Sequence, residues 1–167
     1  MLKKAEKMAT DAGFTPKAVP VKLLFPMLEG ASLEENESLH DMWAALLANA
    51  SSGGMKGKVR AGFISTLKQM EPDEAALLNE FPGSDSEVDE ADLATYFDKL
   101  GFPKNDVVEC LCGLQAAGLI RRGVMAHPPS IFGDSLRPRL VDDLSPYFIT
   151  ERGIAFLAAC TPPKPKS

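Results

Sequence analysis

His40 and Asp41 are neighbouring residues whose types could do acid–base chemistry. A histidine titrates near neutral pH, and a carboxylate can orient its ring. Adjacent residues on a helix lie about 100° apart around its axis, however, so this pair does not face one another as a catalytic dyad would. His127 lies in the segment AHPPS, with no partner at a spacing typical of acid–base or metal sites. We therefore expect a solvent-facing helix pair and a loop histidine.

Other residue types that could bind metals or phosphates also lack the necessary pattern. Four carboxylates cluster before His40, namely Glu29, Glu34, Glu35 and Glu37. A metal site would need a second set of ligands from another helix, and the sequence shows none. The Gly-rich segment 51–58, SSGGMKGK, lacks the spacing and the terminal Lys-Ser/Thr of a P-loop. No Gly-x-Ser-x-Gly elbow occurs. We expect no metal, no cofactor and no enzymatic activity. An effector enzyme with an unrecognised site is kept as an alternative.

The three cysteines show no metal-ligand spacing. Cys110 and Cys112 lie two residues apart on a predicted helix, about 200° around its axis, so they can neither bridge nor chelate together. With Cys160, they are predicted to be reduced, buried thiols. Such thiols fit a cytoplasmic location.

The segment 32–52, SLEENESLHDMWAALLANASS, predicts one amphipathic helix. Ser32 and Glu35 have the spacing of a capping box, which predicts a helix start near Leu33. The apolar residues recur at the spacing of one helix face, and Gly53-Gly54 ends the pattern: Leu39, Met42, Trp43, Leu46, Leu47 and Ala50. We interpret Trp43 as a core residue. A partner groove is the alternative, since tryptophan is enriched at interaction hot spots; Trp43, His40 and Asp41 are the candidates for partner contact.

This helix resembles the central motif of the Abi-alpha family, bacterial proteins named after abortive infection. The matching segment is ASLEENESLHDMWAALLANAS, and the resemblance continues through VRAGFISTLKQMEPDEAALLNEF. It covers residues 15–81 well and the remainder by element order only. Members often carry further sequence upstream, so the chain resembles either a short member or part of a longer one. The resemblance implies a role in defence against phage but brings no established biochemistry and no catalytic motif.

The C-terminal half has a different order of elements. A helix over 89–100 and a second over 104–117 form a helix-turn-helix signature, followed by strands in 119–125 and 146–150 and a last helix capped by Thr150. The second helix is predicted to bury Val107, Val108, Leu111 and Leu114. This layout is similar to that of winged-helix domains.

The fold class expected from these patterns is mainly α. An N-terminal helical bundle over 1–81 carries the family motif, and Leu24, Phe25 and Leu28 form one apolar face in it. A winged helix-turn-helix-like module with a small β-hairpin follows over 86–161, and the tail 162–167 is predicted to be disordered. A polar, acidic linker places the boundary near 82–88, and the long loop 126–146 would be a wing or an ordered arm.

A winged helix raises the alternative of nucleic-acid binding, in which the second helix enters the major groove. The basic candidates are Lys104, Arg121, Arg122, Arg137 and Arg139. Phosphate contacts by Lys and Arg supply most non-specific affinity. Residues 1–70 hold nine Lys and Arg against seven Asp and Glu, whereas residues 71–167 hold nine against sixteen. The acidic C-terminal half therefore disfavours this alternative.

The leading hypothesis is a non-enzymatic protein-interaction component of a bacterial phage-defence system. It would bind a protein partner or associate with itself. No run of about 18 apolar residues and no secretory signal occurs, so we expect a cytoplasmic protein without a membrane segment. An exposed apolar patch would support the leading hypothesis, and convergence of the five basic residues would support a nucleic-acid-binding regulator.

Overall fold

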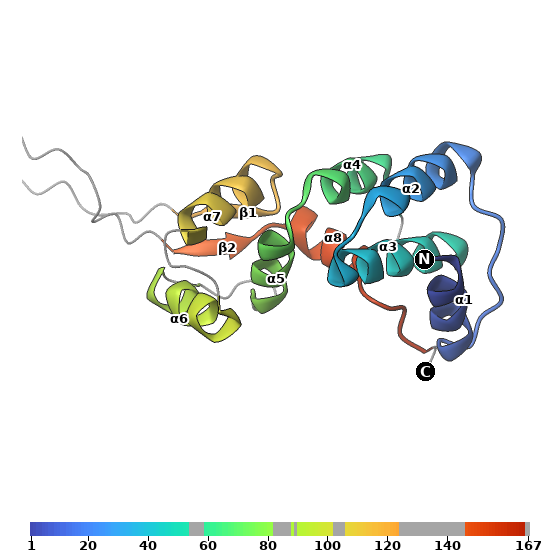
Figure 1. Ribbon diagram of the computed structural model, residues 1–167, viewed down its shortest axis with the longest axis horizontal. Helices are drawn as coiled ribbons and strands as arrows, with labels where there is room; N and C mark the ends of the chain where they lie inside the picture. The colour runs from blue at the N-terminus through green and yellow to red at the C-terminus, as the bar shows by residue number, and fades with distance from the viewer. Residues whose placement is uncertain (54–58, 82–87, 89, 102–105, 124–145, 166–167) are drawn as a thin grey trace, which may run out of the picture.

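The protein is predominantly helical, with one small antiparallel hairpin (Figure 1). The computed structural model describes residues 1–53, 59–81, 88, 90–101, 106–123 and 146–165. These ranges contain α1 (Leu2–Asp11), α2 (Val21–Leu33), α3 (Glu37–Ser51), α4 (Ala61–Gln69), α5 (Pro72–Glu80), α6 (Glu90–Leu100), α7 (Asp106–Ala116), β1 (Ile120–Arg122), β2 (Tyr147–Ile149) and α8 (Glu151–Cys160). The mainly α fold predicted from the sequence is confirmed.

Helix α3 lies at the centre of the helical bundle, in contact with α1, α2, α5 and α8. Every residue from Met42 to Asn49 is buried. The predicted apolar face is indeed buried, but the prediction of an amphipathic helix with one solvated side is wrong for this stretch. Alanines occupy the other side, and their small side chains let the neighbouring helices approach closely: Ala44, Ala45 and Ala48.

The start of α3 also differs from the prediction. Asn36 is the N-cap, and its side-chain oxygen accepts hydrogen bonds from the backbone N–H groups of Ser38 (3.0 Å) and Leu39 (3.2 Å). Ser32 lies in the last turn of α2, where its hydroxyl donates to the carbonyl of Glu29. The predicted capping box at Ser32 and Glu35 is therefore wrong, because α2 continues through Ser32.

Trp43 lies in the core, where its side chain is 1% exposed. Its ring packs against Gly30 of α2, and a Cβ atom at Gly30 would come within 2.6 Å of two ring atoms. Real Cβ contacts are not that short, so α2 and α3 can approach this closely only with glycine at this position. Gly30 thus makes room for the largest side chain of the core.

Helix α8 is held against α3 by Asn49, a buried polar residue. The Asn49 amide nitrogen lies 2.9 Å from the carbonyl oxygen of Ala159, 2.8 Å from that of Thr161 and 3.5 Å from that of Ala158. The last carbonyls of a helix have no partner within the helix. Asn49 therefore caps the C-terminal end of α8 from a helix more than one hundred residues earlier in the chain.

The C-terminal elements follow the predicted order. β1 pairs antiparallel with β2, with Ile120 opposite Ile149, and Val88 bridges to Tyr147 on β2. Thr150 caps α8, as predicted, by accepting a hydrogen bond from the backbone N–H of Gly153 (3.0 Å). On α7, the prediction that Val108 is buried is wrong: it is 57% exposed, because the buried face runs through Val107, Cys110, Leu111 and Leu114.

The buried apolar residues form one cluster that extends from Ala5 to Cys160. Residues 82–87 and 124–145 lie outside the described residues, so the predicted boundary at 82–88 and the predicted wing stay predictions. Among the helices that the structure describes, none combines the length and apolar character needed to cross a membrane.

Candidate functional site

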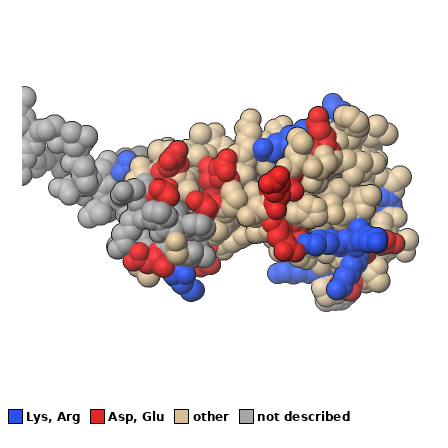
Figure 2. Space-filling model, viewed as in Figure 1, with Lys and Arg blue, Asp and Glu red and all other residues tan. Residues whose placement is uncertain are grey.

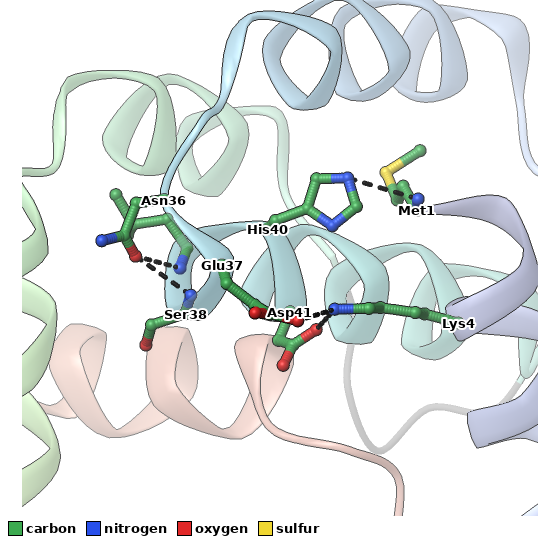
Figure 3. Close-up of polar contacts among 8 residues, drawn as sticks. Met1, Lys4, Asn36, Glu37, Ser38, His40 and Asp41 are labelled. Carbon is green, nitrogen blue, oxygen red and sulfur yellow. Dashed lines mark hydrogen bonds and ion pairs between the residues drawn. The ribbon is translucent and has the colours of Figure 1, made fainter.

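His40 and Asp41, two of the candidates for partner contact, bind α1 instead (Figure 3). The His40 Nε2 atom lies 3.3 Å from the Met1 amino nitrogen. The Lys4 ammonium contacts Asp41 and also lies 3.2 Å from a carboxylate oxygen of Glu37. Both candidates are half-buried rather than solvent-facing.

Lys4 is the cation of this cluster. Its hydrogen bond to Asp41, followed by that to Glu37, raises the pKa of Lys4 above its ordinary value. The ammonium therefore stays charged at neutral pH, and its two carboxylate partners lie on α3. This arrangement fastens α1 to α3, and it leaves no histidine–carboxylate pair poised for acid–base chemistry.

Two of the five basic candidates for nucleic-acid binding lie on the described part of the hairpin. Arg121 and Arg122 are exposed on β1. The Arg121 guanidinium lies 4.6 Å from the centre of the Phe148 ring, and that of Arg122 lies 5.9 Å from the centre of the Tyr147 ring. The other candidates, and His127, lie outside the described residues: Lys104, Arg137 and Arg139. Convergence of the five stays a prediction.

A groove of about 500 Å³ lies between α4, α5, α7 and α8. Arg152 of α8 is fixed at its wall: Nε donates to the Ala117 carbonyl (3.2 Å), and Nη2 donates to the Thr66 hydroxyl (3.0 Å). The Thr66 hydroxyl in turn donates to the carbonyl of Gly62 (2.9 Å). Arg152 and Thr66 are therefore engaged in holding α4, α7 and α8 together.

Glu74 of α5 lines the same groove. Its carboxylate accepts a hydrogen bond from the backbone N–H of Glu71 (3.0 Å), and one oxygen lies so close over Gly113 of α7 that a Cβ atom there would clash with it. Burial is the main cause that raises the pKa of Glu74 above its ordinary value. No neighbouring residue in the sequence signals the burial of this carboxyl, because α7, which covers it, lies much later in the chain.

The raised pKa of Glu74 predicts a specific pH dependence of stability. An acid whose pKa is raised by folding binds its proton more tightly in the folded state, so the free energy of unfolding falls as pH rises through the folded pKa. Glu74→Gln removes this titration and keeps an oxygen for the Glu71 N–H. We expect urea midpoints of the wild type to fall relative to Glu74→Gln as pH rises above the ordinary glutamate pKa of about 4. Curves that stay parallel above this pH would contradict the prediction.

Neither Cys110 nor Cys160 is an activated nucleophile. Cys110 is buried and Cys112 exposed, which confirms that the two lie on different sides of α7, whereas the prediction that Cys112 is buried is wrong. Burial, helped by nearby carboxylates, raises the pKa of Cys110 to about 11, and burial alone raises the pKa of Cys160 further. A thiol must ionise to act as a nucleophile, so these two stay inert at neutral pH. Within the described residues, no group of three or more His, Cys, Asp or Glu side chains could hold a metal ion.

Helix α2 exposes large apolar side chains at the edge of the bundle. Val21 is 77% exposed and Phe25 is 68% exposed, one helical turn apart. We name the α2 outer face as Val21, Lys22, Phe25, Leu28 and Glu29. In Figure 2 the area where Figure 1 places α2 is mostly tan, whereas Lys and Arg gather over α1. Phe25, which was predicted to lie on an apolar face, is therefore largely exposed.

An apolar hollow of about 360 Å³ adjoins this face, between α1, the segment 12–20, α2 and α3. Its lining is Leu2, Ala5, Glu6, Pro16, Lys17, Val19, Leu24, Leu47 and Ser51. Leu24 follows Val21 by three residues and precedes Phe25, so apolar surface continues from the hollow to the α2 outer face. The sequence signal for this surface is the composition of α2, in which apolar residues far outnumber the three polar ones, Lys22, Glu29 and Ser32. A helix this rich in apolar residues usually has more than one side buried.

The comparisons with known proteins agree with the resemblance carried by the α3 segment. The model of the family described as abortive infection alpha matches residues 1–112 of the 167 residues. This range contains α2, α3 and the contacts between them. No curated protein and no solved structure gives a significant match to the chain. Because the family match spans more than half of the sequence, the chain belongs to the abortive infection alpha family.

Proposed function

We propose that the chain is a non-enzymatic protein-interaction component of a bacterial abortive infection system, and that it binds its partner through the α2 outer face. Exposure of Val21 and Phe25, one turn apart on the same helix, is the observation that carries this proposal. Single exposed apolar residues are common on protein surfaces. Here Leu24 connects the pair to an apolar hollow that Leu2, itself 61% exposed, also lines. Contiguous apolar surface of this kind is typical of interaction sites.

The state of the ionisable side chains supports a role in binding rather than in catalysis. His40, Asp41, Glu74 and Arg152 all have hydrogen-bond or ion-pair partners within the chain. Catalytic groups need a partner geometry that also leaves a reacting atom accessible between them. These contacts connect one helix to another or close a helix end, as expected of structural residues.

The proposal predicts that phage protection requires the α2 outer face. Phe25→Glu places a charge at the centre of the face, and removal of a central aromatic anchor typically costs about 2 kcal/mol or more of binding free energy. We expect protection to be lost, with plating efficiency rising to that of cells without the protein. Circular dichroism and Trp43 emission should stay unchanged, because Phe25 contributes little to the core.

Val108→Glu is the matched control, since Val108 is also an exposed apolar residue but lies on α7. This variant should retain full protection. If a folded Phe25→Glu variant protects cells as well as the wild type, the α2 outer face is not the partner-binding surface.

Nucleic-acid binding is the second candidate, and exposed Arg121 and Arg122 on β1 are the observation in its favour. Asp106 and Glu109 in the first turn of α7 weaken it, because they repel phosphates. We expect no salt-sensitive binding to labelled duplex DNA or single-stranded RNA in fluorescence anisotropy. Binding at low salt that disappears in the Arg121→Glu/Arg122→Glu variant would instead place this candidate first.

A further inference from the structure

We infer that the partner on the α2 outer face is a second copy of this chain. The α2 helices of the two copies would pack antiparallel, with a twofold axis passing near the Phe25–Pro26 bond. This inference rests on the proposed function, because it names the occupant of the same surface. A twofold contact must be self-complementary, since the same patch is presented by both copies.

The charges of the α2 outer face meet this requirement. Lys22 and Glu29 lie at equal distances on either side of the Phe25–Pro26 bond. They are seven residues apart, close to two full turns, so they lie on one side of the helix. In the antiparallel arrangement, Lys22 of each copy therefore faces Glu29 of the other, and two equivalent ion pairs form.

Both charged residues are accessible for such pairs. Lys22 is exposed, and among the described residues it forms no salt bridge. Glu29 contacts Lys68 of α4 through one carboxylate oxygen, and its side chain is 53% exposed. A carboxylate has two oxygens and accepts several hydrogen bonds. Glu29 can therefore accept from Lys22 of the second copy while it retains Lys68.

The apolar residues are compatible with the same axis, although the midpoint of Val21 and Leu28 lies one residue away from it. Phe25 lies beside the proposed axis and would contact the Phe25 ring of the second copy. Val21 and Leu28, also seven residues apart, lie together on the side of Phe25 away from the charged pair. Val21 of one copy would thus lie near Leu28 of the other. The result is an apolar centre with a charged rim, the usual anatomy of a specific interface.

The expected association is reversible and weak. One helix pair buries less than the roughly 1,200–2,000 Å² of a standard stable interface, which corresponds to a weak or transient contact. We therefore expect a monomer–dimer equilibrium with Kd in the micromolar range, visible by sedimentation velocity of the purified chain across a concentration series. Phe25→Glu should sediment as a monomer, whereas Val108→Glu should sediment as the wild type.

Charge reversal tests the antiparallel register directly. Lys22→Glu gives two Glu–Glu contacts in its homodimer, and Glu29→Lys gives two Lys–Lys contacts. Each variant alone should dimerise about tenfold more weakly than the wild type. In an equimolar mixture, both contacts of the mixed dimer become Lys–Glu pairs, and wild-type affinity should return. Glu35→Lys, an exposed reversal outside the α2 outer face, should leave dimerisation unchanged.

The outcomes separate this inference from the proposed function. A chain that stays monomeric at every concentration, or charge variants whose mixture associates no better than each alone, would overturn self-association through α2. If Phe25→Glu still abolishes phage protection in that case, the α2 outer face binds a different protein and the proposed function stands. If Phe25→Glu also leaves protection intact, both proposals fail.

Discussion

Replacing Trp43 with alanine is expected to lower the free energy of unfolding by about 3–5 kcal/mol. The ring is almost completely buried at the contact between α2 and α3, so its removal leaves a large cavity among packed helices. A typical domain has only about 5–15 kcal/mol of total stability, so this single change would unfold a large fraction of a marginal protein. Urea unfolding followed by circular dichroism measures the effect without the lost fluorophore.

The control for this change is Phe25→Ala. It also removes one large aromatic side chain, but from an exposed position of α2. We expect a change within about 0.5 kcal/mol, as for most surface substitutions. Similar losses for the two variants would mean that Trp43 does not occupy the core.

The second large effect is expected for Asn49→Asp, a change that nearly preserves shape. The Asn49 amide donates to carbonyl oxygens at the end of α8, whereas a carboxylate presents only acceptors to the same oxygens. An unsatisfied buried group costs about 1–3 kcal/mol, and a charged one costs more. We therefore expect a loss of more than about 3 kcal/mol at neutral pH, measured by urea unfolding.

Protonation should relieve part of this loss. A protonated carboxyl can donate one hydrogen bond, so folding would raise the pKa of the introduced acid, and stability should recover as pH falls toward about 4. Asn79→Asp, on the exposed side of α5, is the matched control and should have little effect. A loss at position 49 that does not depend on pH would argue against the role of the amide as a donor.

The sequence predicted correctly those features that depend on nearby residues. The order of α6, α7, β1, β2 and α8 and the Thr150 cap follow from periodicity and from capping chemistry within a few residues. The burial of Trp43 follows from the apolar spacing of α3. The start of α3 was missed because both Ser32 and Asn36 are good capping residues, and only the continuation of α2 decides between them.

Features that depend on distant contacts could not be predicted. The burial of Asn49 needs α8, and the raised pKa of Glu74 needs α7; neither partner is marked near those residues in the sequence. The exposure of Phe25 could not be predicted either, for a different reason. Periodicity assigns an apolar residue to an inner face, but it does not show whether another helix is present to cover that face.

The hydrogen bonds from Asn49 to the end of α8 join residues 110 positions apart, and this separation has a consequence for the order of folding. A contact between distant segments can form only after the conformational entropy of the intervening chain has been lost. Proteins with many such contacts therefore fold more slowly. Helices such as α3, whose hydrogen bonds join nearby residues, can form early. The side of α3 that contacts α8 stays exposed to solvent until α8 docks. We expect docking of α8 to complete folding, and the interval before it to be the time when the chain is most prone to aggregate.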